Sequence, residues 1–202
     1  ERYPIEGYKS LKIVNPNDLS DIQINELLAI NDLTLGDDYG EFDDWIELTN
    51  HGESPVELDG YYLTDNQNQL TKWSFPFTNI TIEPDSFLII WCDNDDEQGD
   101  LHTNFKLSSG GEFLAIVSPD GSTILDSLTF PEQDADISYG RVVEELLLWD
   151  YMMPTPGSEN GILSLISDMR TVLSNKEGVR ILLLNEGLLV CAGSIITLLA
   201  IS

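Results

Sequence analysis

"DDWIELTNHGESPVELDGYYLTDN", residues 43–66, contains two short runs that are typical of β-strands on either side of a turn. In the first run, alternate side chains fall on opposite faces of an extended chain. One face carries Ile46 and Leu48, and the other carries Trp45, Glu47 and Thr49. The segment "HGESP" between the runs has turn composition. The stretch therefore predicts strands of a sheet, with its carboxylates at the rim of the sheet and in its loops.

The same pattern of short apolar runs and turn residues continues from residue 22 to residue 142. The runs are four to seven residues long and rich in Ile, Tyr, Phe, Trp and Thr, and Gly, Pro, Asn and Asp separate them. No segment in this range sustains the spacing of an amphipathic helix. In "SPDG", residues 118–121, Pro119 presets φ for a turn and Gly121 can supply a positive φ. The sequence therefore predicts an all-β fold, an antiparallel sandwich or barrel.

Hydrophobic residues make up 42% of the chain, so a packed core can form. The run "FLIIWC", residues 87–92, is apolar on both faces, which predicts a central strand of a covered sheet. Its residues from Phe87 to Trp91 are predicted to be core rather than ligand contacts. Across the domain the side chains predicted to be buried are Ile46, Leu48, Leu88, Ile90, Leu114 and Ile116.

Composition divides the chain into three parts. Residues 1–20 show no sustained period and are interpreted as a linker or the end of an upstream segment, residues 21–160 as the β-sandwich domain, and residues 161–202 as an apolar tail. For the tail, extra strands, a membrane or sorting anchor, and a disordered end all remain open, although Glu186 is costly near the middle of a membrane span. Because the chain starts at Glu1 without a methionine, we expect a processed product whose signal peptide, if any, is gone.

The chain has 36 acidic and 9 basic residues, a formal net charge of −27, and residues 1–160 carry the whole excess. Such a surface repels phosphate backbones, so we expect no nucleic-acid binding. The two cysteines, Cys92 and Cys191, imply neither a disulfide framework nor a zinc site. The only histidines are His51 and His102, no G-x-S-x-G nucleophile motif accompanies them, and "SSGGE" is no phosphate-binding loop because no helix start follows it. We therefore expect that the chain is not an enzyme.

Two loops are dense in oxygen ligands, with five carboxylates each in residues 37–44 and 93–100. Calcium takes six to eight oxygens and tolerates flexible loops, so such loops are candidates for Ca²⁺. The predicted ligands are Asp38, Asp43 and Asp44 and, as a weaker choice, Asp93, Asp95 and Asp96. Neither loop has EF-hand spacing, since position 12 counted from Asn94 falls on Phe105. Two solvated acidic loops without a cation remain the alternative.

Several motifs in fixed order carry a family resemblance: "WIEL-N", "L-GYYL-D", "FKLS-GGE", "D-SYGR" and "PTPG". Over roughly residues 21–160 the chain resembles the bacterial lamin tail domain. The resemblance implies an immunoglobulin-like β-sandwich without catalytic activity. It also implies a module of secreted or surface proteins whose ligands are mostly unknown. The chain lacks the basic patch and coiled-coil rod of the animal members, so their DNA contacts are not expected here.

We therefore expect an extracellular or cell-surface bacterial module that mediates attachment or protein interaction. Its partner is expected to be a protein or a surface glycan, with membrane contact only through the C-terminal tail. The alternative is a calcium-dependent accessory domain of a secreted hydrolase whose catalytic part lies outside this chain.

Overall fold

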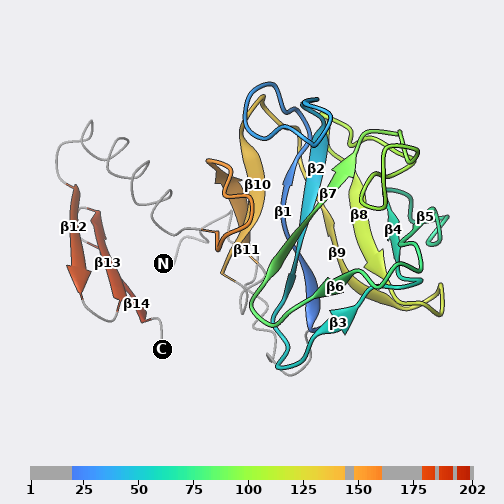
Figure 1. Cartoon of the computed structure of the whole chain (residues 1–202). Helices are drawn as coiled ribbons and strands as arrows, with labels where there is room; N and C mark the ends of the chain where they lie inside the picture. The colour runs from blue at the N-terminus through green and yellow to red at the C-terminus, as the bar shows by residue number, and fades with distance from the viewer. Residues whose placement is uncertain (1–19, 144–147, 161–178, 185–186, 193–194, 201–202) are drawn as a thin grey trace. The chain divides into compact units, whose positions relative to one another are not determined.

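The computed structural model describes residues 20–143 and 148–160, together with the backbone of residues 179–184, 187–192 and 195–200 (Figure 1). The chain forms two compact units, Glu1–Asn160 and Gly161–Ser202. Apart from Ser20, the predicted linker at residues 1–20 lies outside the described residues. All described elements are β-strands, and every pairing between two strands is antiparallel. The predicted all-β antiparallel fold is confirmed.

A five-stranded sheet and a four-stranded sheet form the first unit, with a two-stranded ribbon beside them (Figure 1). The five-stranded sheet has the order β11-β10-β1-β2-β7. Its strands are β11 (Leu148–Met152), β10 (Ser138–Val143), β1 (Ile22–Leu28), β2 (Asp44–Asn50) and β7 (Phe87–Cys92). The four-stranded sheet has the order β5-β4-β8-β9, formed by β5 (Trp73–Ser74), β4 (Tyr62–Thr64), β8 (Phe113–Val117) and β9 (Ile124–Thr129). The ribbon pairs β3 (Val56–Glu57) with β6 (Thr81–Ile82).

The core lies between the two sheets and is formed by inward side chains of both. Ile46, Leu48, Ile90, Leu114 and Ile116 are fully buried, as predicted, and Leu88 is only partly buried. Their spacing of two along each strand places them on one face, so their burial follows from the alternation of the sequence. Apolar burial of this kind supplies the main favourable term for the fold.

The hairpin predicted at residues 118–121 joins β8 and β9. Gly121 has φ +69°, and its amide donates to the Ser118 carbonyl at 2.9 Å. The Ser118 amide in turn donates to the Thr123 carbonyl at 2.9 Å and closes the loop. The Asp120 carboxylate accepts hydrogen bonds from the amides of Ser122 and Thr123. The positive φ that glycine tolerates is thus used where the sequence suggested it.

The prediction that residues 87–92 form a central strand is wrong, because β7 lies at the edge of the five-stranded sheet. Its free edge is covered by the loop that follows it rather than by another strand. The Trp91 amide donates to the Leu101 carbonyl at 2.8 Å, and the Thr103 amide donates to the Trp91 carbonyl at 2.8 Å. Phe87, Ile89 and Trp91 are consequently half-buried. Apolar composition reports cover over the two faces of a strand and not a neighbour at its edge, which is why the sequence alone did not separate an edge strand from a central one.

The placement of the carboxylates at the rim is also wrong for Glu47, which is fully buried. The whole outward face of β2, Trp45, Glu47 and Thr49, is inaccessible to solvent. The five-stranded sheet is therefore covered on both of its faces. Part of this second covering comes from residues that follow β11, since the Gly157 amide donates to the Glu47 carboxylate.

The second unit contains a three-stranded antiparallel sheet of order β12-β13-β14. Its strands are β12 (Val179–Leu184), β13 (Gly187–Ala192) and β14 (Ile195–Ala200). Within the described ranges, no helix has the length and apolar character needed to cross a membrane.

Candidate functional site

The first acidic loop is organised by hydrogen bonds from its own backbone. The Asp37 carboxylate accepts from the amides of Tyr39 at 2.9 Å and Glu41 at 2.8 Å. The Asp37 amide donates to the Glu41 carbonyl at 3.0 Å, and Gly40 adopts φ +80° between them. Asn31 secures the base of the loop by donating to the carbonyls of Leu35 and Asp43. Asp37 is therefore a folding element of this loop as well as a surface charge.

The second acidic loop starts at a buried pair. The Asp93 carboxylate contacts the Nδ1 atom of His102 and accepts from the Asp95 amide at 3.0 Å. The His102 ring stacks against Trp91 and meets Tyr39 edge-on, with ring centroids 6.4 Å and 6.2 Å apart. Both members of the Asp93–His102 pair are buried. The pair thus anchors the second loop beside the first.

The fold brings the two loops together. The Tyr39 hydroxyl donates to the Gln98 carbonyl at 2.9 Å, and the Gln98 side-chain amide donates to the Glu41 carboxylate at 2.8 Å. Lys106 lies 3.4 Å from the Asp43 carboxylate. Between the loops is an open groove of about 340 Å³, here called the acidic groove. Its lining residues are Glu41, Phe42, Asp43, Asp93, Asp95, Gln98 and Lys106.

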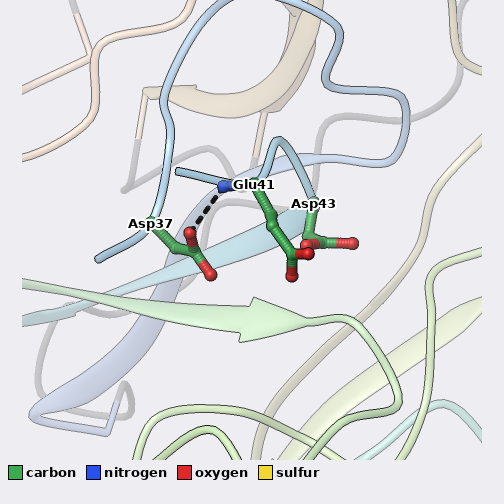
Figure 2. A group of neighbouring side chains, drawn as sticks. All are labelled: Asp37, Glu41 and Asp43. Atoms are coloured by element: carbon green, nitrogen blue, oxygen red, sulfur yellow. Dashed lines mark hydrogen bonds between the residues drawn. The ribbon is translucent and has the colours of Figure 1, made fainter. Parts of the chain in front are cut away.

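Three carboxylates of the first loop converge beside this groove. One oxygen atom from each of Asp37, Glu41 and Asp43 lies within 4.8 Å of the others. Figure 2 shows these side chains, with the hydrogen bond from the Glu41 amide to Asp37. The second carboxylate oxygen of Asp37 is buried and has no hydrogen-bond partner. Three acidic groups so close repel one another, which a cation or a positively charged side chain would relieve.

The structure separates the six ligands predicted from the sequence. Asp43, Asp93 and Asp95 line the acidic groove, whereas Asp38 and Asp96 are exposed and do not line it. The remaining residue, Asp44, accepts a hydrogen bond from the Leu107 amide at 3.1 Å, and burial raises the pKa of its carboxyl group to about 7. Asp43 immediately precedes β2, whose first residue is Asp44, and only Asp43 lines the acidic groove. The assignment of calcium ligands from the sequence stays a prediction, and of its six residues only Asp43 belongs to the carboxylates that converge, Asp37, Glu41 and Asp43.

Sequence reasoning did not nominate Asp37 and Glu41 as ligands, nor Gln98 and Lys106 as groove residues. The carboxylates were recognisable as part of a dense loop, but the geometry of the loop decides which of them converge. No local signal marks Gln98 or Lys106, because their role depends on the approach of two loops that are about 57 residues apart in sequence.

Cys92 offers no nucleophile in this region. Its side chain is fully buried, and burial raises the pKa of the thiol well above its ordinary value. A reactive cysteine needs the thiolate and access to solvent. The geometry around Cys92 is therefore that of a core residue.

A family model described as Lamin Tail Domain matches residues 15–132, more than half of the chain. No curated protein and no solved structure matches the chain.

Proposed function

The chain belongs to the lamin tail domain family, a family of non-catalytic immunoglobulin-like domains. From this premise we propose that the chain is a module that binds another protein through the acidic groove. The observation that carries the proposal is the meeting of the two acidic loops, which concentrates carboxylates from distant parts of the chain around one open groove.

The groove combines carboxylates with exposed aromatic rings. The side chain of Phe42, at the groove, is 48% exposed and that of Tyr39, in the same loop, is 62% exposed. Aromatic faces and carboxylates together favour the ammonium and guanidinium groups of Lys and Arg. Lys106 already extends one ammonium group to Asp43 at this place. We propose that the partner presents a basic segment, and that the net charge of −27 increases its rate of association.

The same charge supports the proposal that nucleic acids are not ligands, because they would be repelled. We further propose that the protein is secreted or displayed on the surface of a bacterial cell. The support for this setting is its acidic composition and the resemblance of its motifs to the bacterial lamin tail domain. Any membrane contact is assigned to the C-terminal tail alone.

Binding of a basic peptide tests the proposal. A fluorescent peptide with four arginines is expected to bind the full chain, and Glu41→Gln/Asp43→Asn is expected to weaken binding about tenfold, since each exposed ion pair contributes up to about 1 kcal/mol. Raising the salt concentration from 0.05 to 0.5 M is expected to weaken binding further. Fluorescence anisotropy measures both effects.

The matched control is Glu57→Gln/Glu83→Gln, which removes the same two charges from exposed positions outside the groove lining. If this variant weakens peptide binding as much as the groove variant does, the whole surface attracts the peptide and the assignment of the binding site to the groove is wrong. A peptide with four glutamates should not bind.

A weak calcium site is a second candidate function, favoured by the convergence of Asp37, Glu41 and Asp43 and by the unpartnered Asp37 oxygen. These residues supply hard oxygen ligands of the kind Ca²⁺ prefers, and the carbonyls of the loop could add to them. The domain would then act as a calcium-dependent accessory domain of a secreted hydrolase, with catalysis elsewhere in the protein.

Titration calorimetry with Ca²⁺ is expected to give a Kd of about 10⁻⁴ to 10⁻³ M, the range of extracellular modules. At a hundredfold excess over Kd, calcium would stabilise the fold by about 2.7 kcal/mol. Glu41→Gln/Asp43→Asn should abolish the heat, whereas Asp38→Asn, an exposed residue of the same loop, should leave it unchanged. Equal heats from all three proteins would show that the loop is only solvated.

A further inference from the structure

Two buried glutamates lie side by side on the covered face of the five-stranded sheet. Glu26 of β1 and Glu47 of β2 are Cα partners in the strand register, and both side chains are inaccessible to solvent. Residues 154–160, here called the closing segment, lie over them. The Thr155 amide donates to Glu26 Oε1 at 3.0 Å, and the Gly157 amide donates to Glu47 Oε2 at 2.5 Å. Each glutamate thus receives one backbone hydrogen bond from the closing segment.

Asn160 ends the closing segment and ties it to two strands. Its side-chain amide donates to the carbonyls of Asn25 in β1 at 2.8 Å and Arg141 in β10 at 2.9 Å. Gly140 makes room for it, because a Cβ atom there would lie 2.8 Å from Asn160 Nδ2. The glycine of "SYGR" and the segment "PTPGSEN" therefore serve the same closure.

The hydrogen-bond count shows where a proton belongs. The Thr155 hydroxyl lies 2.9 Å from Glu26 Oε2 and 3.1 Å from Asn160 Oδ1, two acceptors for a single hydrogen atom. Asn160 Oδ1 also accepts from Asn25 Nδ2 at 3.1 Å. With a proton on Glu26, the acid O–H donates to Thr155 Oγ1, whose own hydrogen then reaches Asn160. Glu47 differs, since both of its oxygens face N–H donors, Asn25 Nδ2 at 2.7 Å and the Gly157 amide. The contacts of Thr155 therefore favour Glu26 over Glu47 as the residue that carries the proton.

We propose that residues 154–160 form a proton-dependent latch, in which one proton held on Glu26 and relayed through the Thr155 hydroxyl closes the segment over β1 and β2, and loss of that proton releases it. The outer surface of the segment supports its ability to open, because residues 157–159 are exposed. Release frees seven residues ahead of the second unit, a reach of about 24 Å when extended.

Burial favours this proton. Desolvation raises the pKa of both carboxyl groups, and the charge of one adds to the cost of ionising the other, so the closed pair retains one proton, which the contacts of Thr155 assign to Glu26. A proton bound more tightly in the closed form than in the open form strengthens closure at low pH and weakens it as the pH rises above about 4.5, the value for an open glutamate. The loss continues up to the closed-form pKa and then levels off.

The described residues of the five-stranded sheet and the closing segment include few other ionisable groups. Their ionisable side chains, besides the pair, are Asp44, Cys92, Tyr139, Arg141, Asp150, Tyr151 and Glu159. The one cation among them, Arg141, is engaged 2.6 Å from Asp126 and stacks on Trp149. Among these groups, only Glu26 acts on the Glu47 pKa through its charge. Among these groups, Glu26 is thus the main electrostatic influence on Glu47.

Hydrogen exchange on the full chain tests the latch. After correction for intrinsic rates, the opening constant of the peptide spanning residues 153–160 is expected to rise with pH above pH 5, by at most about tenfold per pH unit, the limit for a single proton. Glu26→Gln mimics the protonated acid, since its amide N–H can donate to Thr155 Oγ1. It is expected to keep the pH 5 protection at pH 7. Glu47→Gln sets an NH₂ group against an N–H donor and is expected to lose protection at both pH values.

Peptides from β4 and β8 provide the internal reference for global unfolding. Thr155→Val keeps the amide donor and removes the relay, so its pH dependence should flatten to less than twofold per unit. The proposal is overturned if Glu26→Gln keeps the wild-type slope, or if the core peptides show the same slope as the closing segment. It is equally overturned if Thr155→Val leaves the slope unchanged.

Discussion

Gly111→Ala is expected to lower the free energy of unfolding by more than about 3 kcal/mol, or to prevent folding. Gly111 adopts φ +86°, where an L side chain is strained. A Cβ atom there would lie 2.5 Å from the Phe130 carbonyl oxygen and 2.7 Å from the Pro131 carbonyl carbon. Both atoms belong to backbone that is held in place, because the Phe130 amide donates to the Glu112 carbonyl at 3.0 Å. Urea denaturation measures the loss.

The neighbouring Gly110 is the control for this change. Its Cβ atom would meet only Ser108 Oγ, at the ordinary distance of 3.7 Å. Gly110→Ala is expected to change stability by no more than about 0.5 kcal/mol. Equal losses for the two variants would contradict the account of "SSGGE" as a turn whose second glycine is required by close backbone approach.

Phe75→Ala is expected to cost about 3–5 kcal/mol of unfolding free energy, the range for large core aromatics. Phe75 is fully buried, and its ring meets Trp73 edge-on with centroids 4.7 Å apart. The Phe75 backbone is also bonded to the residue that precedes β4, since the Phe75 amide donates to the Tyr61 carbonyl at 2.9 Å. Removing the ring leaves a cavity that this rigid surrounding cannot fill. Thermal and urea unfolding check the value.

Phe77 is the matched control, two residues along the chain and 80% exposed. Phe77→Ala is expected to change stability by less than about 1 kcal/mol, because its ring is largely exposed to solvent. If Phe77→Ala lowered the unfolding free energy as much as Phe75→Ala, the assignment of Phe75 as buried and Phe77 as exposed would be wrong. The comparison isolates burial from residue type.

The fold class followed from local patterns that the chain carries in each segment. Alternation at Ile46 and Leu48 assigned the core face correctly, because the side-chain period of a strand is set by backbone geometry alone. The turn at residues 118–121 was readable for the same reason, since Gly121 supplies a conformation that few other residues adopt. Such features depend on neighbours in sequence, and the family motifs agree with them.

The sequence also indicated that residues 37–44 and 93–100 are the acidic loops, but not that they share one groove. Their meeting depends on Gln98 contacting Glu41 beside the paired start of β2 and end of β7, a contact without any local signal. Which carboxylates converge was likewise decided by the turn around Gly40, which brings Asp37 and Glu41 together and leaves Asp38 outside. Electrostatic function of this kind is a property of distances between segments.

Burial on the second face of the sheet was decided only by the tertiary structure. Glu47 alternates with Ile46 and Leu48 as a solvent-facing residue would, and nothing beside it in the sequence indicates otherwise. It is buried because residues 154–160 return across β2, more than a hundred residues later, and Gly157 donates to its carboxylate. Alternation tells which side chains share a face, whereas the cover over that face is supplied by distant chain, so a strand's own residues cannot report it.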